Sequence, residues 1–373
     1  MIPVAQATEA GEALALLPLH ERLFQLVAIA IGGLLLLTTL FVLQTIWLRI
    51  RNARGEARWR RREALWTKLI PEALSGERSA EDVRDRIEPA DHRAFLDFLL
   101  RFSREVKGPE LDRLRTIAAP FLDSIVDDLA DRRTFRRARA VQALGTLGMK
   151  EHETQVARAL DDEAPLVAML AARALAAHGT VSEHRAAVVA RLPRFENWSD
   201  AYLKALLSGM GPAVAPRLRT MLGDRTQPLR SRRVAALALQ ELHDSSAADL
   251  AAELLNPSEP VDLLVPLLRL LGHVGRPEHL HAVLPLLEAE AAPVRAAAYQ
   301  AVGALGNAGE AALLERGLSD PSPWVAQAAA RGLLRVGTGH RLRAVADGDG
   351  SEAGFAAQVL EEAAGRSSVE SAQ

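Results

Sequence analysis

The chain has 373 residues and contains no cysteine, which excludes disulfide bonds, thiolate metal sites and cysteine nucleophiles. Alanine and leucine dominate, aromatic residues make up only 4%, and β-branched runs of strand length are scarce, so the composition predicts an all-α protein. The formal net charge of −2 hides a segregation, because residues 1–22 sum to −2, residues 49–68 to +6 and residues 69–373 to −6.

The first predicted element is an uncharged stretch, residues 23–48, which follows a short segment, residues 1–22. As an α-helix, its 26 residues would measure about 39 Å, enough to cross a hydrocarbon core of roughly 30 Å. A secretory signal peptide would instead begin with a basic region and have an apolar stretch of about 7 to 15 residues. Neither property fits, so residues 23–48 are predicted to form a transmembrane helix.

A basic segment, residues 49–69, follows the apolar stretch and predicts its orientation. Arginine is concentrated on this side, and positive residues tend to stay in the cytosol. We therefore expect a single-pass protein of the cell inner (plasma) membrane, with residues 1–22 outside and the rest of the chain in the cytoplasm. The expected membrane-interface anchors are Trp47, Arg49, Arg51, Arg54, Trp59, Arg60, Arg61, Arg62 and Trp66.

Two interpretations are open for residues 57–69, which have the sequence ARWRRREALWTKL. They either continue the transmembrane helix, which we favour, or form an amphipathic helix on anionic lipid headgroups. Residues 70–120 are also predicted to be helical, because the stretch RAFLDFLLRFSREV is strongly amphipathic. They match the following repeat poorly, and we interpret them as an N-terminal cap.

A repeat with a period of 31 to 32 residues extends over residues 121–340. In each unit, a short apolar helix leads to a polar turn, and a second helix then ends at glycine or at a histidine in its place. These end marks are Gly148, Gly179, Gly211, His243, Gly275, Gly306 and Gly337. The second helix opens at Pro165, Pro228, Pro260, Pro293 and Pro323. Since proline suits the first helical turn and glycine a left-handed C-terminal cap, these marks predict both ends of the second helices.

Small residues recur on one face of the second helices and would let neighbouring backbones approach closely. They include Ala171, Ala172, Ala297, Ala298, Ala328 and Ala329. Since one helical pair cannot bury its apolar face alone, we expect the pairs to stack on one another.

Three units show the pattern most clearly: DEAPLVAMLAARALAAHG at 162–179, EAAPVRAAAYQAVGALG at 290–306 and LSDPSPWVAQAAARGLLRVG at 318–337. They resemble the HEAT family, specifically the short bacterial HEAT-like repeats also found in phycobilin lyases. The resemblance implies a right-handed α-solenoid of about seven HEAT-like helical pairs, preceded here by one transmembrane helix.

The resemblance also implies a ladder between successive repeats, in which an acid before the proline meets an arginine shortly after a proline. The residues that fit this pattern are Asp162, Asp224, Asp320 and Arg295. Ala168 and Ala326 stand where arginine is common, and the unit at 181–220 is irregular. We therefore expect a discontinuous ladder.

The end of the chain departs from the repeat. Residues 341–365 contain FAAQVLEEAAG, which resembles a degraded last unit, and we interpret them as the C-terminal cap. Residues 366–373 are rich in serine and glutamate and are predicted to be disordered.

The sequence shows no Walker-type lysine, dinucleotide fingerprint, G-x-S-x-G elbow or H-E-x-x-H pair. His273, His279 and His281 lie near one turn, but no carboxylate or thiolate is placed to complete a set of metal ligands. The acidic stretch at 346–352 lacks the spacing of an EF-hand loop. We therefore predict a protein that is not an enzyme, with no catalytic, cofactor or metal site and no small-molecule substrate.

Seven residues of the second helices are predicted to face away from the core, on the concave surface where partners of solenoids usually dock. They are Arg137, Arg173, Arg232, Arg269, Arg295, Tyr299 and Arg331. In an alternative interpretation, the arginines cover their neighbours or pair with acids in the turns and only stabilise the repeats.

These features predict a non-catalytic, membrane-tethered scaffold or adaptor of bacterial origin, whose cytosolic solenoid binds a partner protein. A cell-envelope enzyme such as a glycosyltransferase is one candidate partner. Two alternatives are an enzyme like the phycobilin lyases and a nucleic-acid-binding solenoid. The charge of −6 over residues 69–373 argues against nucleic acid, because phosphates require a basic surface.

Overall fold

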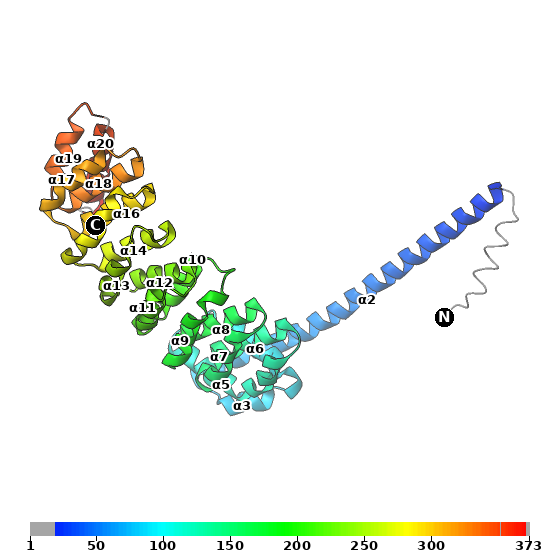
Figure 1. The fold of residues 1–373 in the computed structure, drawn as a ribbon. Coiled ribbons are helices and arrows are strands. Elements are labelled where there is room, and N and C mark those ends of the chain that lie inside the picture. Colours follow the sequence, from blue (N-terminus) through cyan, green and yellow to red (C-terminus); the bar gives the residue numbers. More distant parts are fainter. Residues whose placement is uncertain (1–18, 351, 371–373) are drawn as a thin grey trace. The chain divides into compact units, whose positions relative to one another are not determined.

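The computed structural model describes the backbone of residues 19–350 and 352–370, in which every regular element is a helix. The side chains of residues 19–23, 25–26, 48, 50–61 and 366–370 are outside this description. The chain divides into two compact units, Met1–Arg86 and Ile87–Gln373 (Figure 1). The all-α class predicted from the composition is confirmed.

Unit 1 contains α2 (Leu19–Ser75) and α3 (Ala80–Arg86). α2 is one continuous helix of 57 residues, so the chain has no break between the apolar and the basic segment (Figure 1). This agrees with the favoured interpretation, in which residues 57–69 continue the apolar helix. The predicted start of the N-terminal cap at residue 70 falls inside α2, which ends just before Gly76, where φ is 88°.

The apolar part of α2, Val27–Trp47, is long and apolar enough to cross a membrane. None of this segment is buried by the rest of the described chain, and Leu37, for example, is 68% exposed. A helix that is apolar on all sides needs an apolar environment, which the protein does not provide here. A signal sequence near an N-terminus has the same properties. The predicted external segment, residues 1–22, lies outside the described residues except for the backbone of its last four.

Unit 2 is an array of helical pairs. The second helices are α6 (Thr134–Leu147), α8 (Pro165–His178), α10 (Asp200–Gly209), α12 (Leu229–Glu241), α14 (Val261–Val274), α16 (Ala292–Leu305) and α18 (Pro323–Arg335). The first helices are α5 (Pro109–Val126), α7 (Met149–Arg158), α9 (Ser182–Ala190), α11 (Ala215–Gly223), α13 (Ala248–Leu254), α15 (Leu280–Val283) and α17 (Ala311–Leu318). Each second helix packs on the second helix of the next pair, and we call this layer the second-helix row. The predicted solenoid of helical pairs is confirmed, whereas its handedness stays a prediction.

Short 3₁₀ helices connect or extend many of these elements. They are η1 (Pro89–Asp91), η2 (Asp127–Ala130), η3 (Ala159–Asp161), η4 (Leu192–Arg194), η5 (Pro212–Val214), η6 (Ser245–Ala247), η7 (Pro277–His279), η8 (Leu284–Glu288) and η9 (Ala308–Glu310). Because η8 directly follows α15, the first helix of that pair is mostly 3₁₀.

Proline marks the start of the second helices as predicted. Pro165 and Pro323 are the first residues of α8 and α18, and Pro293 is the second residue of α16. Pro228 and Pro260 come directly before α12 and α14. Proline has no N–H to lose and a φ angle already near the helical value, so it favours these starts.

The residues that follow the second helices adopt the predicted left-handed conformation only in part. Gly211, Gly337 and His243 have φ values of 75°, 80° and 54°, which fit a left-handed cap. Negative φ values occur at Gly148, Gly179, Gly275 and Gly306. The left-handed cap is therefore wrong for these four. At Gly275 a Cβ would lie 2.4 Å from the carbonyl oxygen of Leu271, so glycine suits the site because it lacks a side chain.

The predicted small-residue face is buried between the second helices. Its members Ala171, Ala172, Ala297, Ala298, Ala328 and Ala329 are at most 3% exposed. α16 and α18 approach so closely that a Cβ on Gly303 would lie 2.5 Å from the Cα of Gly332. The absence of side chains at this point brings the two backbones into contact.

The ends of unit 2 extend the array beyond the predicted repeats. α4 (His92–Phe102) packs against α5 and α6, and the rings of Phe95 and Phe121 meet edge to face at 4.9 Å. The predicted cap border at residue 120 falls inside α5, which is the first helix of the pair that ends with α6.

α19 (Gly339–Ala346) and α20 (Ala353–Glu370) form one more pair where the C-terminal cap is predicted, and α20 packs on α18. α20 continues to Glu370, so residues 366–370 have helical backbone where disorder is predicted. Residues 371–373 lie outside the described chain.

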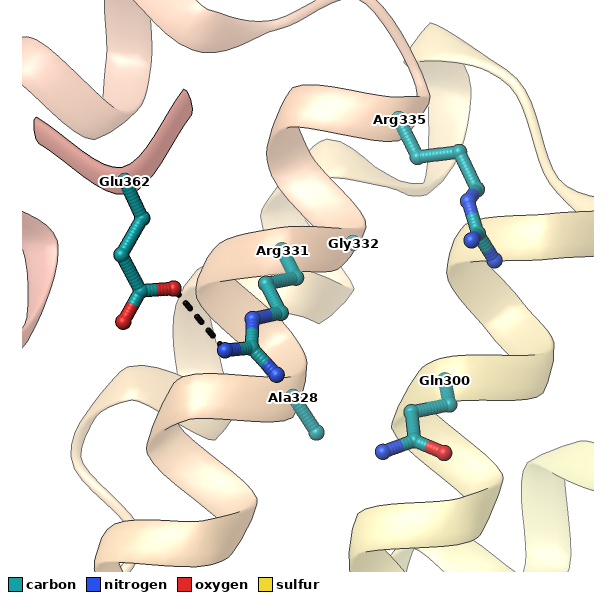
Figure 2. A pocket seen from close by; sticks show the side chains of 6 residues that line it. All are labelled: Gln300, Ala328, Arg331, Gly332, Arg335 and Glu362. Atoms are coloured by element: carbon teal, nitrogen blue, oxygen red, sulfur yellow. Dashed lines mark hydrogen bonds and ion pairs between the residues drawn. The ribbon is translucent and has the colours of Figure 1, made fainter. Parts of the chain in front are cut away.

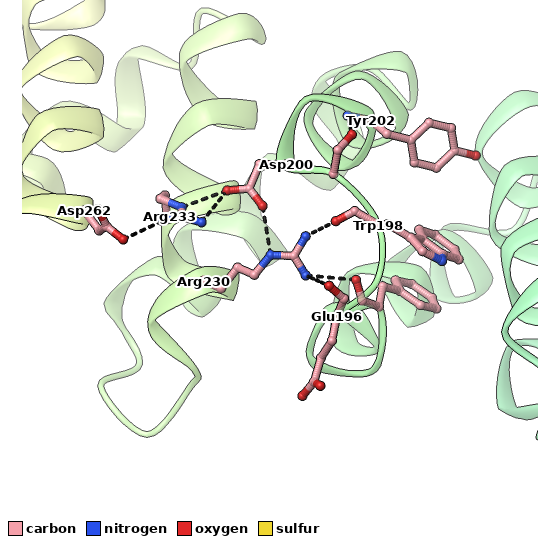
Figure 3. Close-up of polar contacts among 9 residues, drawn as sticks. Glu196, Trp198, Asp200, Tyr202, Arg230, Arg233 and Asp262 are labelled. Atoms are coloured by element: carbon pink, nitrogen blue, oxygen red, sulfur yellow. Dashed lines mark hydrogen bonds and ion pairs between the residues drawn. The ribbon is translucent and has the colours of Figure 1, made fainter.

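The pair of α9 and α10 departs from the others because a loop precedes α10. In this loop the rings of Phe195 and Trp198 stack, with centroids 4.0 Å apart. Arg230 of α12 donates hydrogen bonds to the carbonyl oxygens of Phe195 (3.0 Å), Glu196 (2.8 Å) and Trp198 (Figure 3). Its Nε also donates to the Asp200 carboxylate at 2.8 Å. One guanidinium therefore holds both the loop and the first residue of α10.

Candidate protein-binding surface

Arg137, Arg232 and Arg295, predicted to line a binding surface, each occupy the fourth position of a second helix. Arg295 donates from Nε and Nη2 to the two carboxylate oxygens of Asp320, at 2.8 and 2.9 Å. Its Nη1 donates to the main-chain carbonyls of residues 289 and 290, both at 2.8 Å. The side chain thereby joins the turn before its own helix to the turn before α18.

Arg137, on α6 near the other end of the array, makes the same arrangement. Its guanidinium donates to Asp162 at 2.8 and 3.0 Å and to the carbonyl of Asp131 at 2.9 Å. Arg232 differs, because it donates to the carbonyl of Leu222 at 3.0 Å and lies 3.5 Å from a carboxylate oxygen of Glu259.

The electrostatics of these pairs agree with their geometry. The hydrogen bonds from Arg295 are the largest influence on Asp320 and hold the pKa of that carboxyl below its usual value. Burial would raise the pKa of Asp162, but hydrogen bonds from Arg137 and from the N–H of Ala164 outweigh burial and lower it. Both carboxyls are therefore ionised partners of the guanidinium groups at neutral pH.

The structure thus places these three arginines in the ladder between repeats, as in the alternative interpretation, and not on an open surface. Arg137 and Arg232 are only 7% and 5% exposed. Ala168, Leu264 and Ala326 occupy the equivalent position in α8, α14 and α18, so the ladder is discontinuous as expected.

Tyr299 was also predicted to face a partner, but it is 7% exposed. Its ring packs against Gly317, where a Cβ would lie only 2.5 Å from the ring. Burial raises the pKa of its phenol. Tyr299 therefore belongs to the core between α16 and α17, and this part of the prediction is wrong.

Arg173, Arg269 and Arg331 are exposed, as predicted. All three occupy the ninth position of their second helices, α8, α14 and α18. Arg331 donates to Glu362 of α20 at 2.9 Å. No ion pair is found for Arg173 or Arg269 among the described side chains.

The second-helix row is basic although unit 2 as a whole is acidic. Its seven helices contain twelve arginine or lysine residues and only three carboxylates, which are Asp200, Glu241 and Asp262. Each of these carboxylates pairs with a cation, as Figure 3 shows for Asp200 and Asp262, which lie on either side of Arg233 at 2.7 Å. Within the described part of the row, the cations without an ion pair are Arg173, Arg269 and Arg335.

A groove of about 770 Å³ opens between α16, α18 and α20. Figure 2 shows Gln300 and Arg335 on one side of it and the ion pair of Arg331 with Glu362 on the other. The groove therefore offers amide and guanidinium donors, and one of its two arginines already has a carboxylate partner.

The sequence prediction missed several exposed apolar side chains in this row, three of them at one helical position. Phe135, Leu166 and Trp324 are 67%, 48% and 76% exposed. Each is the second residue of its helix, so the position directly after the helix start would have indicated them. Aromatic residues such as Phe135 and Trp324 are enriched in protein-binding surfaces.

The predicted membrane-interface anchors have different environments. Trp47 is 58% exposed and Arg49 is exposed, whereas Arg62 is half-buried and Trp66 is only 3% exposed, which does not suit an interfacial ring. The side chains of the remaining predicted anchors lie outside the description; these are Arg51, Arg54, Trp59, Arg60 and Arg61.

The three histidines near one turn have separate hydrogen-bond partners. The Nδ1 atom of His279 accepts from the N–H of Arg276 at 2.9 Å, and its Nε2 lies 2.8 Å from Asp249. His273 instead meets the ring of His243 at 4.5 Å, and the Nδ1 of His281 contacts a main-chain carbonyl. Among the described residues no group of three or more potential metal ligands occurs.

Comparison with protein families agrees with the repeat architecture. Residues 262–335, from α14 to α18, match the family of HEAT repeats, which confirms the predicted HEAT-like repeat. No curated protein matches the chain. Among solved structures, the chain is similar to the complex of CpcE and CpcF of phycocyanin lyase from Nostoc sp. PCC7120. The identity is 22% and the TM-score 0.30, and the match covers 65% of this chain and 87% of that chain.

Proposed function

We propose that the chain is a membrane-tethered scaffold without catalytic activity, whose second-helix row binds an acidic segment of a partner protein. Stacked helical repeats of this type present an extended surface to partners. The observation that carries the proposal is the pair of exposed arginines, Arg173 and Arg269, at the same helical position and without an ion pair in the described chain. Arginine is among the residues that most often anchor protein interfaces.

A protein partner fits this surface better than a nucleic acid does. Nine of the twelve cations in the row already pair with carboxylates of the chain, so few are free to neutralise phosphates. Nucleic-acid binding needs a continuous basic footprint. Separate arginines on a row that also exposes aromatic side chains, Phe135 and Trp324, match a protein interface instead.

The tether in this proposal is Val27–Trp47 of α2. The arginines that follow it would remain in the cytoplasm, so the repeats would be cytoplasmic and residues 1–22 external. An enzyme of the cell envelope that acts at the same membrane is the class of partner to seek first.

The test is copurification of partners from detergent-solubilised membranes with the full chain and with a double variant, Arg173→Glu and Arg269→Glu. The variant should lose a specifically bound protein because two anchoring charges are reversed, and its helicity should be unchanged because both side chains are exposed. A matched control is Arg158→Glu, at an exposed arginine on the first helix α7. Retention of the partner by the double variant would contradict the proposed surface.

A further inference from the structure

A cavity of about 270 Å³ lies between α4, α5, α6 and α8 in unit 2. Its apolar walls include Leu100 and Leu170, and its polar lining includes Arg104, Gln142 and Arg173. None of its lining residues is a carboxylate. The volume is large enough for one or two side chains, and smaller than most small-molecule pockets.

The two guanidinium groups in this lining lack ion-pair partners. Neither Arg104 nor Arg173 forms an ion pair within the described chain, and both are exposed. Two cations beside one apolar cavity repel each other, and an anion between them would relieve this repulsion. A carboxylate suits the site best, because its two oxygens match the fork of N–H donors on arginine.

His178 also lines the cavity, and its pKa depends on the nearby charges. Its Nδ1 lies 3.2 Å from Nη2 of Arg115, whose Nε donates to the carbonyl of Thr146 at 3.1 Å. Since guanidinium can only donate, Nδ1 must accept, and the ring is neutral with its proton on Nε2. Burial, and then the charges of Arg115 and Arg173, lower the pKa of His178.

We propose that this cavity binds a carboxylate that is flanked by an apolar group, namely an aspartate or glutamate next to an apolar residue in an acidic peptide. Arg104 and Arg173 would hold the carboxylate, and the leucine walls would receive the neighbouring side chain. The inference rests on the proposed scaffold function, for which it names the chemistry of the partner segment.

The experiment follows the NMR titration of His178 in the full chain, labelled with ¹³C-histidine, held in bilayer discs of zwitterionic lipid and assigned with His178→Gln. The probe is the capped dipeptide Leu-Glu, and the matched control is capped Leu-Gln. Leu-Glu should raise the pKa of His178 toward its usual value, because the bound carboxylate offsets the charge of Arg173, and Leu-Gln should not. An equal effect of both dipeptides, or no effect of either, would overturn the inference.

Variants show whether the cavity is the site. Arg104→Gln and Arg173→Gln should each weaken Leu-Glu binding about tenfold or more, as expected for loss of a charge-assisted pair. Arg269→Gln, at the same helical position in α14 but outside the cavity, should bind normally. Equal weakening by Arg269→Gln would contradict a local site.

Further arms separate the sources of the anion. Inorganic phosphate that binds as tightly as Leu-Glu would show a simple anion site. Anionic lipid discs that shift the pKa of His178 without peptide would point to a lipid headgroup. Either result overturns the peptide proposal.

The cavity inference and the scaffold proposal can fail separately. If Leu-Glu does not bind while the Arg173→Glu and Arg269→Glu double variant still loses its partner, only the cavity inference falls. If Leu-Glu binds and the double variant keeps its partner, the scaffold surface falls, and the cavity stands as a carboxylate site but not as the place where that partner docks.

Discussion

The guanidinium of Arg295 and the carboxylate of Asp320 form two parallel hydrogen bonds, 2.8 and 2.9 Å long, across 25 residues of sequence. Because Asp320 also accepts from the N–H of Ser322 at 2.8 Å, the pair fixes the turn that leads into α18. The same separation of 25 residues joins Arg137 to Asp162. Each pair therefore links one helical pair of the solenoid to the next.

Asp320→Asn should destabilise the junction of α16 and α18. The amide can accept only on one oxygen, and its NH₂ group would face the guanidinium donors of Arg295, so we expect a loss of about 2 kcal/mol. Hydrogen exchange should accelerate in residues 289–323 and change little in α6 and α8, because repeats contact mainly their neighbours. Asp123→Asn, at an exposed position of α5, is the control. If residues 289–323 exchanged at the same rate in Asp320→Asn and Asp123→Asn, the Arg295–Asp320 pair would not stabilise this junction.

Stability should also depend on pH through this carboxyl. The pKa of Asp320 is lower in the folded chain than its ordinary value of 3.8. The unfolded chain therefore binds the proton first, and the contribution of Asp320 is complete above pH 3.8 and lost as the pH falls through the lower folded value. Wild type should lose more stability than Asp320→Asn between pH 5 and pH 2, as measured by urea unfolding. Parallel curves would show that the pair does not contribute.

Glu153 provides an unusual helix cap, because it lies in α7 and caps α9. Its carboxylate accepts from the N–H groups of Thr180 (3.0 Å) and Val181 (2.9 Å), the two residues directly before α9, and from the Thr180 hydroxyl at 2.8 Å. Burial raises its pKa, but these hydrogen bonds outweigh burial and lower it. Glu153→Ala should cost about 1 kcal/mol or more, the usual effect of losing a cap, and Glu153→Gln should cost less. Hydrogen exchange of the Thr180 and Val181 amides would measure both effects, and equal protection in all three proteins would contradict the cap.

The elements that follow from local chemistry could be predicted from the sequence. Pro165 and Pro323 fix helix starts because the ring itself sets φ, whatever the neighbours are. The negative φ of Gly148 could not be predicted from the sequence. Glycine is needed there because a Cβ would lie 2.3 Å from the side chain of Leu122 on another helix. Contacts between distant segments decide such positions.

The proposed binding surface could be predicted only in part for a similar reason. Arg269 and Arg295 are the same residue type on equivalent helices, but they occupy positions nine and four, which differ by about 140° around a helix. Position four points to the next turn and position nine to solvent. An arginine 25 residues before an acid, with proline three residues after that acid, is the signal that separates the two at Arg137 and Arg295.

Two glycines give opposite predictions for the same substitution. Gly303→Ala would place a Cβ 2.5 Å from the Cα of Gly332, so α16 and α18 must separate, and we expect a loss of about 1 to 3 kcal/mol. Gly209→Ala in α10 meets nothing within 4 Å, and the higher helix propensity of alanine should stabilise by up to about 1 kcal/mol. Thermal unfolding of the two variants checks both signs. Destabilisation by both would mean that the close approach of α16 and α18 is not the cause.

The apolar segment of α2 can be tested with substitutions of matched exposure. Leu37 and Leu65 are both 68% exposed, but only Leu37 lies within Val27–Trp47. Arginine at the centre of a membrane-spanning helix costs about 2.5 to 3.5 kcal/mol, so Leu34→Arg with Leu37→Arg should release the chain from membranes under alkaline extraction. Leu65→Arg should leave it bound.

The mass of the membrane-bound chain separates an anchor from a signal sequence. An anchor is retained, so the full chain of 373 residues should be recovered with the membrane. A signal sequence would be removed together with the apolar segment, so the shortened chain would begin after residue 47. Alkaline extraction would then release this chain from membranes, both in the wild type and in the Leu34→Arg and Leu37→Arg variant. Recovery of only this shortened, extractable chain would contradict the tether, and the scaffold would then have to reach its partner without a membrane segment.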